Sequence, residues 1–130
     1  MMNTPAFENL DLACAKMGKE IADKLSKELE NLITSALAVL EEQGVYALFL
    51  FLKTQGKSLG QTICDRLYDF LKETPQVSPL LSKDGNNIFN ALQQLGKDLD
   101  SLLLCRDLLR QTLVYARYHA RLLEDVEMGS

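Results

Sequence analysis

The chain of 130 residues has no tryptophan, a single histidine and only three cysteines. Cys14, Cys64 and Cys105 are odd in number and far apart, which argues against a disulfide framework and favours buried, reduced thiols in a cytoplasmic protein. No two cysteines have C-x-x-C spacing, and His119 has no second histidine with which to complete a zinc site. We therefore expect a chain that binds no metal.

Catalytic motifs are missing as well. Covalent and acid–base catalysis usually need a positioned base beside a nucleophile or an acid. The one histidine, His119, falls on the apolar side of the last predicted helix, so we interpret it as a hydrogen-bonded core residue. No complete phosphate-binding loop is present, because Phe51 stands where the pattern that ends in Gly56-Lys57-Ser58 needs its first glycine. The sequence predicts a protein that is not an enzyme, needs no cofactor and acts by binding.

Long apolar runs are absent too. The longest uncharged one, Val45–Leu52, is far shorter than the roughly 18–20 residues that cross a bilayer. Glu8, Asp11 and Lys16 interrupt the stretch where a signal peptide would have its apolar core, so we expect a cytoplasmic protein. The net charge of −4 argues against a generally basic nucleic-acid binder, although a local basic surface can still bind phosphate.

What the chain does contain is apolar residues at helical spacing, interrupted by only three prolines and seven glycines. We predict an all-α, single-domain bundle of five to six helices over residues 1–128, with a long C-terminal helix. Residues 129–130 are typical of a cloning remnant. The predicted helices span about Thr4–Leu32, Ile33–Glu42, Val45–Leu52, Ser58–Glu73, Asn87–Leu95 and Asp98–Asp125. Gly44 is the expected left-handed helix end, and residues 74–85 are the one long irregular segment.

Four arginines of the last predicted helix fall within an arc of about 60° on a helical wheel. This arginine row consists of Arg106, Arg110, Arg117 and Arg121. Like charges four residues apart repel, so we expect Asp107, Glu124 and Asp125, or an external anion, to offset the cost. Guanidinium groups spaced along one helix suit successive backbone phosphates. A solvated polar face is the alternative interpretation.

A second basic cluster lies in the middle of the chain, with two tyrosines nearby. Its members are Lys53, Lys57, Arg66 and Lys72, and the tyrosines are Tyr46 and Tyr68. A solvated surface is the simpler interpretation of this cluster. We retain Lys53 and Lys57 as second candidates for contact with nucleic acid.

The stretch Ala38–Lys53 resembles the hallmark of the small subunit of type III-B CRISPR RNA-guided effector complexes. In that family a helix ends at an Asn-Gly or Gln-Gly step, and an apolar helix ending in Phe-Leu and a lysine follows. A long, arginine-bearing C-terminal helix comes later and matches Leu102–Leu123. Ser35-Ala36-Leu37 stands where the family often has a tyrosine and a proline, and Tyr115 or Tyr118 stands for its C-terminal tryptophan.

This resemblance implies a non-catalytic role in antiviral defence. Family members stack along the inner face of the effector and help to hold the guide RNA–target RNA duplex, while a neighbouring subunit cuts the target. The implied partners are guide and target RNA, backbone subunits of the RAMP type and further copies of the chain, with no membrane. The arginine row would contact phosphates, with Lys53 and Lys57 as second candidates.

The alternative is a helical adaptor or dimerisation domain whose partner is another protein. It predicts an exposed apolar patch and no salt-dependent binding of RNA. We expect such a patch at Val45, Phe49 or the segment Pro75–Leu81.

Overall fold

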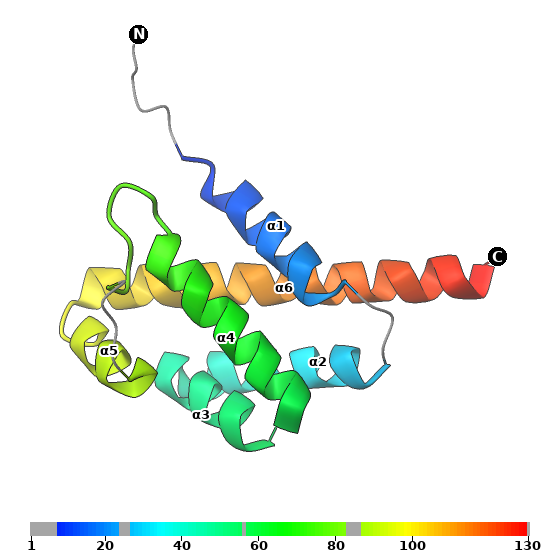
Figure 1. Ribbon diagram of the computed structural model, residues 1–130, viewed down its shortest axis with the longest axis horizontal. Helices are drawn as coiled ribbons and strands as arrows, with labels where there is room; N and C mark the ends of the chain where they lie inside the picture. The colour runs from blue at the N-terminus through cyan, green and yellow to red at the C-terminus, as the bar shows by residue number, and fades with distance from the viewer. Residues whose placement is uncertain (1–7, 24–26, 56, 83–86, 130) are drawn as a thin grey trace, which may run out of the picture.

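The computed structural model describes residues 8–23, 27–55, 57–82 and 87–129, and in the last helix it describes side chains through Leu123. The described residues form six helices and no strand, which confirms the predicted all-α bundle with a long C-terminal helix (Figure 1). The helices are α1 (Leu10–Ile21), α2 (Lys27–Gln43), α3 (Val45–Gln55), α4 (Lys57–Glu73), α5 (Ile88–Leu95) and α6 (Leu99–Gly129). None of the described helices has the length and apolarity that crossing a membrane requires.

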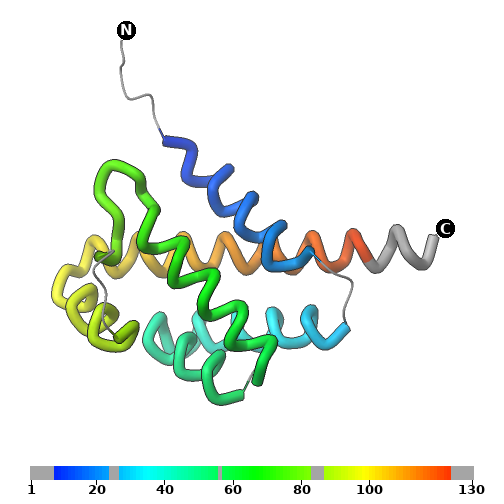
Figure 2. Tube along the Cα trace, in the orientation of Figure 1, coloured from blue at the N-terminus to red at the C-terminus, as the bar shows by residue number. Residues whose placement is uncertain are grey.

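Helix α6 is the axis around which the other helices are arranged. It runs along the molecule, α1 crosses it on one side and α2 lies beside it on another (Figures 1 and 2). Helix α3 packs between α2 and α4, and α5 covers the end of α3. Leu109 and Leu113 of α6 are fully buried, as are Leu48, Phe49 and Leu67 from α3 and α4. The core thus occupies one side of α6 and leaves its opposite side to solvent.

The predicted division of the N-terminal third is wrong. We expected one helix to Leu32 and a second from Ile33, whereas α1 ends at Ile21 and α2 runs unbroken through both of those residues. Ala22, the residue after α1, has the non-helical angles φ −103° and ψ 49°. The apolar positions keep a helical spacing on both sides of this break, so periodicity alone does not reveal it. The predicted start at Thr4 lies outside the described residues, and α1 itself begins at Leu10, with Asn9 as its N-cap.

Most of the remaining helix ends agree with the predictions, but α3 continues to Gln55 rather than Leu52 and α6 to Gly129 rather than Asp125. Gly44 has φ 98°, the left-handed conformation that ends α2 and lets α3 begin at Val45. The Asn87 side chain caps α5 by accepting a hydrogen bond of 2.7 Å from the Phe89 amide. Residues 74–82 are irregular, as predicted for 74–85.

Helices α1 and α6 meet at a close crossing that depends on Gly18. A Cβ atom at this position would lie 2.7 Å from Cβ of Tyr115 and 2.9 Å from the carbonyl oxygen of Thr112. Because Gly18 has no side chain, the two backbones can approach to this distance. The crossing fixes which side of α6 is covered by α1.

The three cysteines are free and buried, as the sequence predicts. Burial penalises the thiolate and raises the pKa of Cys64 to about 11 and that of Cys105 to about 12. Burial also raises the pKa of Cys14, whose Sγ donates to the Leu108 carbonyl at 3.5 Å. These thiols therefore act as small apolar core groups rather than as nucleophiles.

Candidate nucleic-acid interface

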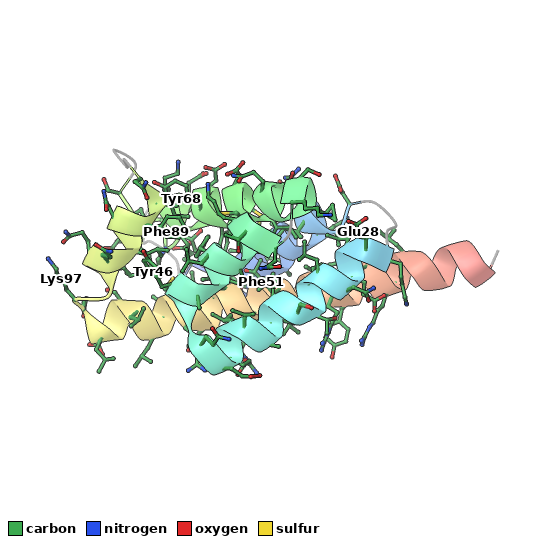
Figure 3. All side chains as sticks on the ribbon, turned by 90° about the horizontal axis from the view of Figure 1, so that it is seen from below. Glu28, Tyr46, Phe51, Tyr68, Phe89 and Lys97 are labelled. Carbon is green, nitrogen blue, oxygen red and sulfur yellow. The ribbon has the colours of Figure 1, made fainter. Side chains whose placement is uncertain are left out.

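The arginine row lies on the side of α6 that faces away from the core. The side chains of Arg106, Arg110 and Arg121 are 42%, 50% and 52% exposed, and Arg117 is partly exposed. Helix α2 borders the row on one flank (Figure 3). On the other flank α1 is tied to α6 by Asp11, whose carboxylate accepts a hydrogen bond of 2.8 Å from the Tyr115 hydroxyl. Four guanidinium groups are thus held at the surface by a rigid helix.

Two of these arginines share one carboxylate of α2. Nε of Arg110 lies 2.8 Å from Oε1 of Glu41, and Nη2 of Arg106 lies 3.9 Å from Oε2 of the same residue. Arg106 also donates to the backbone carbonyl of Glu41 at 3.2 Å. Glu41 therefore offsets the repulsion that we expected Asp107 to offset, and Asp107 forms no ion pair within the described part of the chain. The sequence could not reveal this pairing, because Glu41 comes from another helix.

Arg121 differs from the other three arginines because its partner is a largely buried carboxylate. Its Nε lies 2.9 Å from Oε2 of Glu30, whose side chain is only 11% exposed. Lys27 approaches the other carboxylate oxygen at 3.5 Å. A buried carboxylate is costly unless it is paired, so Arg121 stabilises the junction of α2 and α6. The side chains of Glu124 and Asp125, the other expected partners, lie outside the described residues.

Arg117 is the member of the row that has no ion pair or hydrogen bond to any side chain that the structure describes. A guanidinium group carries five N–H donors in a planar fork, which matches a phosphate or a carboxylate. Arg106, Arg110 and Arg121 also keep donors free, because each contacts its described partners through only one nitrogen. The row therefore offers one unpaired guanidinium and three partly engaged ones.

The second basic candidates lie away from the row. Lys53 is exposed and lines a small pocket with Tyr68 and Phe89, whereas Lys57 is exposed and lines another pocket with Glu28. Figure 3 shows Tyr68 and Phe89 at one end of the bundle and Glu28 toward the other. No residue of the arginine row lines either pocket. The structure therefore does not join Lys53 and Lys57 to the arginine row in one continuous surface.

The other two cations of the middle cluster have acidic partners within the protein. Lys72 lies 3.2 Å from Asp69 and also sits over the Tyr68 ring, 4.5 Å from its centroid. Arg66 lies 3.9 Å from Glu20 of α1. Tyr46 packs against Phe89, with ring centroids 5.3 Å apart. These contacts favour the interpretation of the middle cluster as an ordinary solvated surface.

The prediction for His119 is wrong in its details. The side chain is partly exposed rather than buried, and it forms no hydrogen bond with the described residues. Helix α1 crosses α6 near Ala116, where Gly18 makes its closest approach. The surface one turn later is consequently only partly covered. His119 has neither a core role nor a nucleophile beside it.

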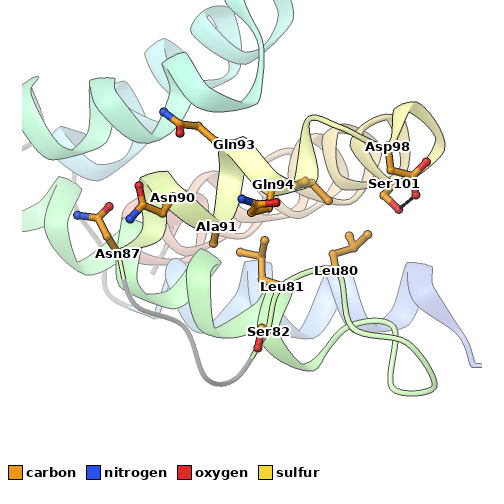
Figure 4. A pocket seen from close by; sticks show the side chains of 11 residues that line it. Leu80, Leu81, Ser82, Asn87, Asn90, Ala91, Gln93, Gln94, Asp98 and Ser101 are labelled. Atoms are coloured by element: carbon orange, nitrogen blue, oxygen red, sulfur yellow. Dashed lines mark hydrogen bonds between the residues drawn. The ribbon is translucent and has the colours of Figure 1, made fainter.

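A groove of about 730 Å³ lies between the irregular segment and α5 (Figure 4). Its floor is apolar, with Leu80 and Leu81, and its walls carry the carboxamides of Asn90, Gln93 and Gln94. Asp98 is the one charged residue among its described lining residues, and it accepts a hydrogen bond of 2.6 Å from the Ser101 hydroxyl. The groove could not be predicted from the sequence, because an irregular segment and a separate helix form it together.

The apolar patch that we expected for an adaptor is buried at three of its positions and exposed in the irregular segment. Val45, Phe49 and Leu81 face the core, whereas Val77 is 85% exposed and its neighbours Gln76, Ser78 and Pro79 are exposed as well. Other large apolar side chains are also exposed. They are Leu12, Tyr46, Leu50, Leu99, Leu103, Tyr118 and Leu122. The last four lie on α6, so this helix carries both the arginines and much of the exposed apolar surface.

The described residues contain no group of three or more histidine, cysteine or acidic side chains that could hold a metal ion. The site is therefore a half-exposed guanidinium surface on a rigid helix, bordered by the carboxylates of Glu30 and Glu41. Such a surface can bind an anion. Comparisons with protein-family models, with curated proteins and with solved structures found no match for this chain.

Proposed function

We propose that this chain is a non-catalytic small subunit of a type III CRISPR RNA-guided interference complex, in which it helps to hold the guide RNA–target RNA duplex. The observation that carries the proposal is the arginine row, with four guanidinium groups on the solvent side of α6. The resemblance of Ala38–Lys53 to the family's hallmark supports it. The all-α fold with a long C-terminal helix is consistent with that resemblance.

The contacts in this proposal are made to phosphates. Guanidinium groups along one helix recognise the charge and spacing of a nucleic-acid backbone, and they do not read base edges from this geometry. Binding is then strong at low salt and indifferent to sequence. Arg117 carries the largest share, because it has no partner among the described residues, whereas Lys53 and Lys57 act as second candidates on separate surfaces.

The other partners in this proposal are backbone subunits of the RAMP type and further copies of the chain. Stacking of copies requires an open-ended contact between two different surfaces of the molecule. The setting is the cytoplasm, where guide RNAs are found. A few phosphate contacts per copy are weak, and repetition of the subunit along one RNA strengthens them.

A protein-binding adaptor is the second candidate, and one observation favours it. Leu99 and Leu103 lie four residues apart at the start of α6 and are 66% and 47% exposed. Side chains at this spacing share one face of a helix. A protein partner that covers them would bind without RNA.

The decisive experiment is co-purification of a tagged chain from its native host. We expect a large ribonucleoprotein with short guide RNAs from the natural sequence, and loss of RNA from a triple variant of Arg106→Ala, Arg110→Ala and Arg117→Ala. Arg121 is left in place because it pairs with the buried Glu30.

The matched control removes three exposed cations of α1 and the α5–α6 turn, by the substitutions Lys16→Ala, Lys19→Ala and Lys97→Ala. Its net charge equals that of the triple variant, so retention of RNA by the control and loss by the variant assigns the effect to the row. Recovery of one or two proteins without RNA from the natural chain would sink the proposal and favour the adaptor.

A further inference from the structure

Tyr118 differs from the other tyrosines of the chain. The Tyr115 hydroxyl donates to Asp11, the Tyr46 ring packs against Phe89, and the Tyr68 ring lies under the Lys72 ammonium group. Tyr118 is 62% exposed and has no ring contact or hydrogen bond with the described residues. A large aromatic ring held on a rigid helix and directed to solvent is a feature that packing does not explain.

The neighbours of Tyr118 on the helix surface include a cation and apolar groups. Residues three and four positions apart are adjacent on a helix, so Arg121 and Leu122 lie on one side of the ring, and Val114 and Tyr115, whose hydroxyl is bonded to Asp11, lie on the other. Leu122 is 58% exposed and Val114 partly so. Arg117, the unpaired arginine, comes directly before Tyr118 in the chain and belongs to the adjacent strip of the same exposed side.

We propose that Tyr118 is a stacking platform for an unpaired base of the RNA, the phosphates of which contact Arg117 and Arg121. The inference rests on the proposed function and adds a base contact to what is otherwise binding of the backbone alone. Proteins that bind single strands combine cationic surfaces with exposed aromatic rings, and every base has a face that can stack. The contact is therefore indifferent to which base is present.

The charges beside the ring favour a nucleic acid over an apolar protein surface as the occupant. Arg117 and the free donors of Arg121 would lie unsatisfied under an apolar partner, and burying unpaired guanidinium groups is costly. A nucleotide supplies both a flat apolar face and a phosphate. The ring and the arginines match these two parts.

The absence of tryptophan from the chain allows a direct test. The substitution Tyr118→Trp introduces a unique fluorophore, and Tyr46→Trp on α3 is the matched control, since Tyr46 is also exposed, at 39%, but packs against Phe89. Both full-length variants are titrated at low salt with short oligouridylate and with an abasic strand of equal length. We expect the oligouridylate to quench the indole fluorescence of Tyr118→Trp and not that of Tyr46→Trp, and the abasic strand to quench neither.

Affinity provides the second readout. Loss of one base–aromatic stack by Tyr118→Ala should weaken oligouridylate binding about fivefold or more, whereas Tyr118→Phe keeps the ring and should keep the affinity. The stacking inference would be overturned if oligouridylate binding depended on Arg117 but was unaffected by Tyr118→Ala, and if the fluorescence of Tyr118→Trp was not quenched. The proposed function would still stand in that case. Absence of any oligonucleotide binding also overturns the inference, and the proposed function is then decided by the co-purification alone.

Discussion

Arginines on one face of α6 have different roles because their carboxylate neighbours differ. Arg121 pairs with Glu30, whose side chain is 11% exposed, and so belongs to the structure of the bundle. Arg110 pairs with Glu41, which is 47% exposed, so the pair lies in solvent and contributes little to stability. Arg117 has no described partner at all. We therefore expect Arg121 to contribute mainly to the stability of the bundle and Arg117 mainly to the binding of anions.

The first prediction compares two single substitutions. Arg121→Ala removes an ion pair from the largely buried Glu30 carboxylate, so we expect a loss of about 1–3 kcal/mol in the free energy of unfolding. Arg117→Ala should change that free energy by less than about 0.5 kcal/mol. Urea denaturation followed by circular dichroism measures both. Equal effects of the two substitutions would contradict the structural role of Arg121.

The second prediction concerns alkaline pH. Burial raises the pKa of Cys105 from 9.0 to about 12, so the folded state holds this proton more tightly than the unfolded state does. The resulting stability is fully present below about pH 9 and is lost as the pH rises toward 12. The loss has a limiting slope of about 1.4 kcal/mol per pH unit for this one group.

Denaturation curves at increasing pH test whether stability falls as the pH rises. In Cys105→Ala the decline in stability above pH 9 should be shallower than in the natural chain, whatever the cost of the small cavity at neutral pH. Cys14 and Cys64 also have raised pKa values, so some decline will persist. An unchanged slope would show that Cys105 does not titrate as its burial indicates.

At the scale of elements, two junctions position the arginine row. The crossing of α1 over α6 at Gly18 sets one flank, and the pairing of α2 with α6 through Glu41 sets the other. The first junction is a matter of steric fit and the second of charge. Each can be altered separately.

The third prediction addresses the steric junction. Gly→Ala in a helix usually stabilises by about 1 kcal/mol, but at Gly18 the new methyl group would meet the backbone and Cβ atoms of α6 at 2.7–2.9 Å. We expect Gly18→Ala to destabilise by about 1–3 kcal/mol, since helices must separate to admit it. Gly96→Ala is the control, because its nearest neighbours would lie 3.5 and 3.6 Å away. Thermal melting of both variants shows whether each substitution raises or lowers the stability of the protein.

The fourth prediction addresses the charged junction. Glu41 occupies the donors of Arg106 and Arg110 that a phosphate would use. We expect Glu41→Gln to raise the affinity for RNA several-fold at low salt, because one competing charge is removed. Glu42→Gln, an equal change of charge at the neighbouring exposed position, is the control. Filter binding of a labelled RNA measures both, and equal gains would mean that only the net charge matters.

At the scale of the whole molecule, most of the fold could be predicted from the sequence. Gly44, Asn87 and the irregular segment after α4 led to correct helix ends, because turn and cap chemistry is local. The end of α1 at Ile21 was missed, since it depends on where α1 must turn to pack on the distant α6. Local chemistry therefore predicts helix ends that local residues determine, and not those that tertiary packing determines.

The site was predictable only in part, for the same reason. The arginine row follows from spacing along one helix, so its exposed position could be predicted. Its partners, Glu30 and Glu41, lie on another helix and could not be identified by inspecting the sequence around the row. The isolation of Lys53 and Lys57 from the row also depends on packing, because it is α2 rather than α3 or α4 that borders the row.

The fifth prediction belongs to this scale, because it depends on the total charge. With a net charge of −4 the chain as a whole repels RNA, and we expect the arginine row to attract it. We expect the logarithm of the binding constant to fall with the logarithm of salt concentration at a slope of about −2, which corresponds to roughly three phosphates. A slope near zero, measured by fluorescence anisotropy, would mean that the row does not contact the backbone.

The extensive packing of α1 on α6 also has a consequence for synthesis. Cys14 and Leu108, which are 94 positions apart, contact each other across this interface. During translation α2, α3 and α4 can form their local hairpins early, whereas α1 must wait for α6, which is made after all of them. Until α6 emerges, the apolar side of α1 has no surface to cover it. The nascent chain is then open to chaperones, and a ribosome that stalls before α6 would release a polypeptide marked for degradation by its own uncovered first helix.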